Sequence, residues 1–157
     1  TADGGVFSFG SAGFYGSMGS VALNKPVVGM ESTRSGNGYW LVASDGGIFS
    51  FGDAGFFGST GDIVLNKPIT SMTAARNGQG YWFVASDGGV FTFGSVEFFG
   101  SRGGSNNRRS TAGMAVTNTN DGYWLVWDDG TSFPFGDAPD FASSVAKRTV
   151  VAMEVVP

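Results

Sequence analysis

Residues 38–52 read GYWLVASDGGIFSFG, and nearly the same phrase returns at residues 80–94 as GYWFVASDGGVFTFG and at residues 122–136 as GYWLVWDDGTSFPFG. The second half of the phrase also stands near the start of the chain, where residues 3–10 read DGGVFSFG. The copies are 42 residues apart. A fixed period of this length is typical of repeat architectures. The chain is therefore a tandem array of one unit, with copies that begin near residues 3, 45, 87 and 129.

Each unit predicts short β-strands. GYWLVA (the Tyr–Trp strand) and IFSFG (the Phe strand) are rich in aromatic and β-branched residues, and Asp-Gly-Gly lies between them, which favours a hairpin over residues 39–51. A third strand, the Met strand, is predicted at residues 27–33 and at the equivalent 69–75 and 111–117. A weaker fourth is predicted in GFYGS and GFFGS, at residues 13–17 and 55–59.

About four short strands per unit, without helical periodicity, are typical of a propeller blade. We therefore expect an all-β fold, a β-propeller of four 42-residue repeats with three to four antiparallel strands per blade. A β-trefoil also uses about four strands per repeat, but it closes with three copies, and the fourth Phe strand counts against it. A β-solenoid is a third alternative, although its coils are usually shorter.

The last unit is degenerate, as a terminal unit of an array often is. About three residues are missing between Ser143 and Val150, as the positions of the methionines show: Met30, Met72, Met114 and Met153. The chain contains four Phe strands and four Met strands but three Tyr–Trp strands, so residues 6–9 and 150–156 should each leave an open edge. The ring could close within one chain, between two chains, or in a longer array; we favour association of chains.

Composition limits the class of protein. The 157 residues are 41% hydrophobic and 14% charged, which predicts one folded repeat domain over residues 1–157. A net charge of −4 argues against nucleic-acid partners and against anionic membranes. Thr1 to Gly5 shows no signal peptide. Without histidine or cysteine, the commonest catalytic bases and metal ligands are missing, so we expect no enzyme, no cofactor and no transition metal.

Aromatic residues provide the first candidate ligand site. The paired phenylalanines of the Phe strands point to one face and should belong to the core: Phe7/Phe9, Phe49/Phe51, Phe91/Phe93 and Phe133/Phe135. The Tyr–Trp pairs follow a glycine turn and carry polar atoms, so they could either pack in the core or stack on a sugar ring. These candidates are Tyr39, Trp40, Tyr81, Trp82, Tyr123 and Trp124.

Charged residues provide the second candidate site. Acids recur before the Phe strand, at Asp45, Asp87 and Asp129 as well as Asp3. The simple interpretation is a turn in which Asp bonds nearby backbone N–H groups. The functional one is a ring that, with Asp53 and Asp137, lines one face and binds hydroxyl groups or calcium. Basic residues recur just before the Met strand, either as solvated loop residues or as a ring that binds anionic groups: Lys25, Lys67, Arg109 and Arg148.

The phrase GYWLVASDGGIFSFGDAGFFGS, followed by LNKP, resembles tandem repeats found in many secreted proteins of actinobacteria. The resemblance covers essentially the whole chain, although SNNRRS at residues 105–110 departs from it. It implies a propeller-like, non-catalytic module that is extracellular or at the cell surface. We expect multivalent recognition of cell-wall or other glycan. The alternative is a structural module that oligomerises, or spaces, an attached exported domain.

Overall fold

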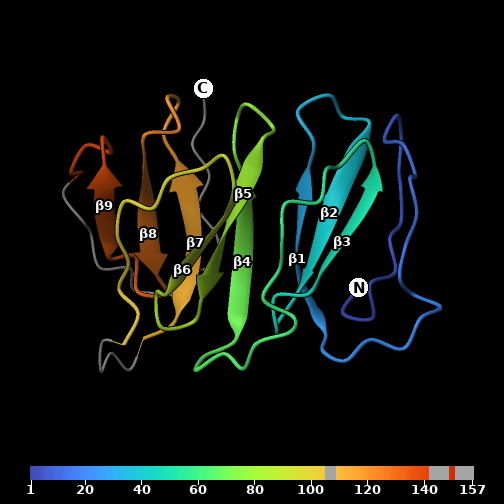
Figure 1. Ribbon diagram of the computed structural model, residues 1–157, viewed down its shortest axis with the longest axis horizontal. Coiled ribbons are helices and arrows are strands. Elements are labelled where there is room, and N and C mark those ends of the chain that lie inside the picture. The colour runs from blue at the N-terminus through green and yellow to red at the C-terminus, as the bar shows by residue number, and fades with distance from the viewer. Residues whose placement is uncertain (105–108, 142–148, 151–157) are drawn as a thin grey trace.

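The fold consists of nine short strands in the part of the chain that the computed structural model describes, residues 1–104, 109–141 and 149–150 (Figure 1). They form three separate antiparallel sheets of three strands, each in chain order. The strands are β1 (Val27–Ser32), β2 (Gly38–Ala43), β3 (Ile48–Gly52), β4 (Ile69–Ala74), β5 (Gly80–Ala85), β6 (Val90–Gly94), β7 (Thr111–Val116), β8 (Gly122–Trp127) and β9 (Ser132–Gly136). The all-β class is thus confirmed.

The predicted hairpin is present, and its register repeats from sheet to sheet. In the first sheet Tyr39 lies opposite Phe51 and Leu41 lies opposite Phe49. The residues 42 and 84 positions later are paired in the same way. The turn between β2 and β3 is held by Asp45, whose carboxylate accepts a hydrogen bond of 3.0 Å from the N–H of Gly47. This contact confirms the turn interpretation of the recurrent aspartates.

The Tyr–Trp strand is the middle strand of every sheet, and all of its residues are buried. The core lies between neighbouring sheets. Trp40 and Val42 of the first sheet pack with Met72 and Tyr81 of the second. The equivalent cluster between the second and third sheets contains Trp82, Val84, Met114 and Tyr123. Each sheet is therefore buried by its neighbours along the chain, as expected for a repeat protein.

The predicted fourth strand does not form. Residues 55–59 run as loop between the first and second sheets, and residues 13–17 run as loop beside the first sheet. Gly58 has a φ of 133°, and a Cβ there would lie 2.6 Å from the ring of Phe93. Instead of a strand ladder, the loop uses side chains: the N–H of Phe57 donates to the hydroxyl of Tyr81 at 3.1 Å. The loop therefore fills the space between two sheets without extending either.

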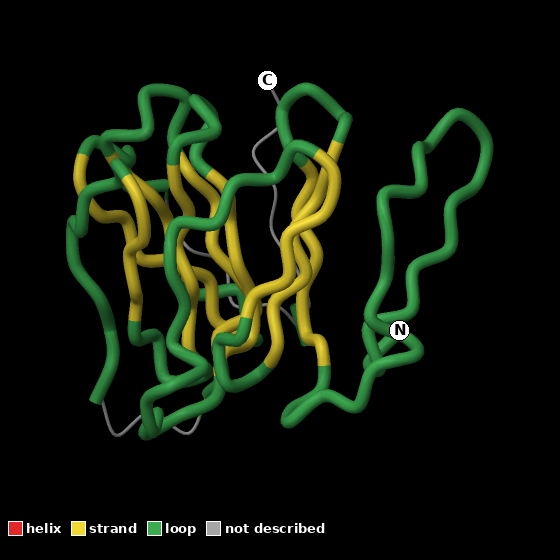
Figure 2. The backbone as a smooth tube through the Cα atoms, turned by 45° about the vertical axis from the view of Figure 1, so that its right-hand side comes forward, coloured by secondary structure: helices red, strands yellow, loops and turns green. Residues whose placement is uncertain are grey.

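The prediction of a core strand at residues 6–9 is wrong. This segment is not part of a sheet, and Phe7 and Phe9 are 74% and 82% exposed. Figure 2 shows residues 1–26 as a long loop beside the first sheet. The physical reason is the lack of a Tyr–Trp strand beside the segment, since that strand holds Phe49 and Phe51 in the first sheet.

The last predicted Met strand is described only at its first residue, Val150. The N–H of Val150 donates a 2.7 Å hydrogen bond to the carbonyl of Asp128, as the N–H of Ile69 donates to that of Ser44. Val150 thus takes the place of Ile69, which agrees with a loss of three residues. The predicted strand at 150–156 otherwise lies outside the described residues. β1 lies against β4 and β4 against β7, whereas β1 and β7 share no contact, so the described strands form an open arc.

Candidate functional site

The Tyr–Trp pairs lie in the core. All six side chains are at most 5% exposed. The indole N–H of Trp40 donates to the carbonyl of Gly55 at 2.7 Å, and Trp82 and Trp124 bond Glu97 and Pro139 in the same way. The rings and their polar atoms are already satisfied within the chain. This burial agrees with the packing interpretation, and it leaves Tyr39, Trp40, Tyr81, Trp82, Tyr123 and Trp124 without an open ring face for a sugar.

The recurrent acids lie at the turns that join β2 to β3, β5 to β6 and β8 to β9. Asp87 accepts a hydrogen bond from the N–H of Gly89 at 3.0 Å, and Asp129 accepts one from the N–H of Thr131 at 2.9 Å. The bond from Thr131 holds the pKa of the Asp129 carboxyl below its usual value. In each of these aspartates, at least one carboxylate oxygen therefore accepts a hydrogen bond within its own turn.

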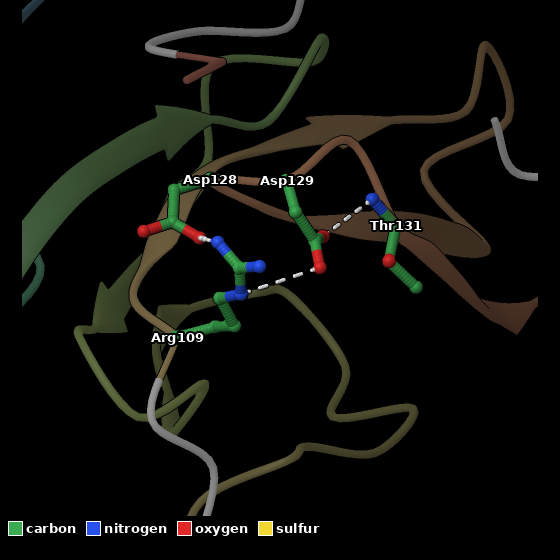
Figure 3. Close-up of polar contacts among 4 residues, drawn as sticks. All are labelled: Arg109, Asp128, Asp129 and Thr131. Atoms are coloured by element: carbon green, nitrogen blue, oxygen red, sulfur yellow. Dashed lines mark hydrogen bonds and ion pairs between the residues drawn. The ribbon is translucent and has the colours of Figure 1, made fainter. Parts of the chain in front are cut away.

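The structure brings one predicted base and one predicted acid together, in the third sheet (Figure 3). Arg109 lies 3.5 Å from Asp129 and 3.7 Å from Asp128. The Arg109 side chain is 54% exposed, so solvent screens both ion pairs. Arg109 and the two acids thus form a local cluster at one end of the third sheet.

Lys25 and Asp45 stand in the equivalent positions at the first sheet and line one surface pocket of about 260 Å³. The entry to each Met strand and the turn before each Phe strand therefore lie at the same end of a sheet. Lys67 is exposed in the same position of the second unit. Arg148 lies outside the described residues. The predicted acidic and basic positions alternate along one end of the array.

Asp53 and Asp137 lie at the opposite end, so the prediction that they share one face with Asp45 is wrong. Asp53 follows β3 whereas Asp45 precedes it. The hydroxyls of Ser35 and Thr33 donate to Asp53 at 2.5 and 2.8 Å and lower the pKa of its carboxyl. Across the described ranges, no group of three or more acids is placed to hold a metal ion.

The inner strands β1, β4 and β7 line a groove of about 1500 Å³ along the concave side of the arc. Two of its hydroxyl groups join neighbouring sheets. Thr70 and Thr111 are hydrogen-bonded through their hydroxyls at 3.0 Å, and the hydroxyl of Thr73 donates to the carbonyl of Met114 at 3.2 Å. The groove wall is therefore part of the junction between the sheets.

A set of exposed aromatic rings was missed by reasoning from the sequence. In each of the first three units, one phenylalanine in the loop that follows the Phe strand is 57–65% exposed: Phe14, Phe56 and Phe98. The fourth unit has Asp140 at this position. The residue that follows each of these phenylalanines turns inward. The ring centroid of Phe57 lies 5.6 Å from that of Tyr81, and the pairs Tyr15/Tyr39 and Phe99/Tyr123 are alike. The two adjacent aromatic residues in GFYG and GFFG are the sequence signal for this exposed ring, although their composition also predicts a strand.

Among the described residues no helix is long and apolar enough to cross a membrane. No family model and no curated protein sequence matches the chain. The chain is similar in structure to the β-propeller domain of Cps50 (Swd1) from Myceliophteria thermophila, with a TM-score of 0.53 and 12% sequence identity. The match covers 79% of this chain but 44% of the other, so this chain spans less than half of that propeller. The likeness supports the propeller fold, while the ring of four units stays a prediction.

Proposed function

We propose that this chain is a non-catalytic, multivalent module that binds cell-wall or other glycan outside the cell, and that its contact residues are Phe14, Phe56 and Phe98. One observation carries the proposal: phenylalanine is exposed at the same position of the first three units, to 59%, 65% and 57%, whereas Asp140 stands at that position in the fourth unit. This replaces the buried Tyr–Trp pairs as the expected stacking residues.

The repetition of the ring supports a function more than its exposure does. A single exposed apolar side chain is ordinary on a protein surface. Other exposed positions differ freely between the units, for example Ser20, Asp62 and Gly104, which are also 42 residues apart. The ring contacts with Tyr39, Tyr81 and Tyr123 are made by the residue that follows each of these phenylalanines. A requirement at the surface explains the three identical phenylalanines at 14, 56 and 98.

The arrangement favours a polymer as the ligand. The exposed rings of Phe56 and Phe98 lie in separate units, whereas a protein partner needs a continuous interface of roughly 800 Å² on each side. The net charge of −4 disfavours anionic membrane surfaces. A flat aromatic ring can stack on the apolar face of a sugar, and several weak sites on one scaffold bind a repeating chain with avidity.

Retention on insoluble polysaccharide tests the proposal. Purified chain is mixed with chitin, amorphous cellulose or peptidoglycan sacculi, and the bound fraction is measured after sedimentation. We expect retention on at least one of them, a partial loss in Phe56→Ser and a nearly complete loss in the triple variant Phe14→Ser/Phe56→Ser/Phe98→Ser. Val64→Ser, which changes a fully exposed apolar residue outside the set, should bind like the original chain.

Equal retention of the triple variant would overturn the choice of residues. A lack of retention on all three materials would overturn the choice of ligand class, and so would binding to phosphatidylcholine vesicles in their place.

A further inference from the structure

The three equivalent methionines of the Met strands have different surroundings. Met72 and Met114 are buried, with 6% and 4% of their surface exposed, whereas Met30 is 52% exposed. Its neighbour Val28 is 39% exposed. Because the strands and their registers are otherwise the same, the first sheet lacks something that covers the other two.

The two internal junctions show what the missing element is. Met72 belongs to a core cluster with Trp40 and Val42, which come from the Tyr–Trp strand of the preceding sheet. Met114 is covered in the same way by Trp82 and Val84. The cover of a Met strand is therefore the Trp and Val face of the preceding Tyr–Trp strand.

The exposed Phe7 and Phe9 indicate, independently of Met30, that a Tyr–Trp strand is the missing element. Their equivalents Phe49 and Phe51 lie opposite Leu41 and Tyr39 of a Tyr–Trp strand. Successive side chains of a strand point to opposite faces. One strand of this type can therefore place its Trp and Val over Met30 and its Tyr and Leu beside the exposed phenylalanines.

Other backbone hydrogen bonds of an internal junction are also present between residues 1–26 and the first sheet. The N–H of Val27 donates to the carbonyl of Ala2 at 2.8 Å, as that of Ile69 donates to Ser44. The N–H of Met18 donates to the carbonyl of Gly4 at 2.9 Å, which matches the bond between Thr60 and Gly46. Residues 1–26 thus contact the first sheet as residues 43–68 contact the second. The vacant position lies between residues 6–9 and Met30, and we call it the strand notch.

We propose that the strand notch is a docking site for one β-strand with the pattern Gly-Tyr-Trp-Leu-Val-Ala, supplied by another repeat unit and paired antiparallel with residues 6–9. Pairing of an added strand with a free edge supplies main-chain hydrogen bonds, and alternate side chains give specificity. The strands β2, β5 and β8 of this chain are paired on both sides, so the docking strand must have a free edge of its own. The notch is an assembly surface, separate from the proposed polysaccharide contacts.

A labelled synthetic peptide with the sequence of residues 37–44, NGYWLVAS, tests the notch directly. Binding to the full-length chain is followed by fluorescence anisotropy. We expect saturable binding that weakens about ten-fold or more when the peptide tryptophan is replaced by serine, because that ring is the cover for Met30. A scrambled peptide of the same composition should not bind.

Two measurements on the protein distinguish docking from nonspecific adhesion. Met30→Asp should weaken peptide binding about ten-fold, whereas Val64→Asp, at another exposed apolar position, should not change it. Hydrogen exchange should slow at the amides of residues 6–9 when the peptide binds. Equal binding of the scrambled peptide, indifference to Met30→Asp, or no protection at residues 6–9 would each overturn the proposal. None of these outcomes affects retention on polysaccharide, so the two proposals are tested separately.

Discussion

The hydroxyl of Tyr81 donates a hydrogen bond of 2.6 Å to the carbonyl of Gly58, and the same hydroxyl accepts one of 3.1 Å from the N–H of Phe57. One side chain of the second sheet thus satisfies an N–H and a carbonyl of the loop that lies between the first and second sheets. Tyr123 makes the equivalent bonds with Gly100 and Phe99. The loop between sheets depends on these tyrosines because it has no strand ladder of its own.

Replacement of Tyr81 by Phe should lower the free energy of unfolding by about 1–3 kcal/mol, since it leaves a loop N–H and a carbonyl without partners in the core. Urea denaturation measures the change. Tyr15→Phe is the matched control, because that hydroxyl makes a bond of 2.9 Å to Gly36 at an exposed site and its loss should cost about 1 kcal/mol or less. Equal effects at the two positions would contradict the assigned role of Tyr81.

The same burial predicts a loss of stability at alkaline pH. Burial raises the pKa of Tyr81 and Tyr123 above the ordinary value of 10.0. The folded state therefore keeps protons that the unfolded chain loses. This contribution to stability is complete below about pH 10 and disappears as the pH rises through the folded pKa. The urea midpoint should fall above about pH 10, and the fall should be smaller in Tyr81→Phe/Tyr123→Phe. A midpoint that is constant to about pH 11 would exclude this linkage.

Asp53 should titrate below an ordinary aspartate, for which the value is 3.8, because the hydroxyls of Ser35 and Thr33 stabilise its charged form. Its contribution to stability is present above the ordinary pKa and is lost as the pH falls through the lowered one. NMR titration of the carboxyl carbon should show the pKa rising toward 3.8 in Ser35→Ala/Thr33→Val. Asp129 depends on Thr131 and serves as the internal control. An unchanged Asp53 would contradict the assignment.

Two glycines with nearly the same backbone conformation should respond differently to alanine. Gly46 has a φ of +78°, and a Cβ there would lie 1.7 Å from the hydroxyl oxygen of the buried Thr60. Gly36 has a φ of +73° and open space around it. Gly36→Ala should cost about 1 kcal/mol from the positive φ, and Gly46→Ala about 1–3 kcal/mol more from the overlap. Thermal denaturation measures both, and equal losses would show that Thr60 can move away freely.

The sequence alone was sufficient to predict the parts of the fold that depend on local pattern. The hairpin between Tyr39 and Phe51 and the Met strand from Val27 follow from alternation and turn residues, and the structure has both. The loop at 55–59 was predicted wrongly as a strand, because its aromatic pair has strand-like composition. Its conformation depends instead on Gly58 and on bonds to Tyr81, which is distant in the sequence.

Burial was harder to predict than secondary structure. The Tyr–Trp pairs and the Phe56–Phe57 pair are both doubled aromatic residues in the sequence. Only the stacking of the sheets determines which of these rings are covered. Phe7 and Phe49 stand in the same phrase, yet one is exposed because no Tyr–Trp strand lies beside it. The periodic pattern identified equivalent positions, whereas the neighbours of each position depend on the three-dimensional junction.

In the second and third sheets the preceding Tyr–Trp strand buries the methionine of the Met strand, whereas Met30 of the first sheet lacks this cover. The most direct measurement compares the free energies of unfolding of Met72→Ala and Met30→Ala, which make the same change at equivalent positions. We predict a loss of about 2–5 kcal/mol for Met72→Ala, where Trp40 and Val42 enclose the side chain. For Met30→Ala we predict a change within about 0.5 kcal/mol, as at other exposed sites. Equal losses at the two positions would contradict the account.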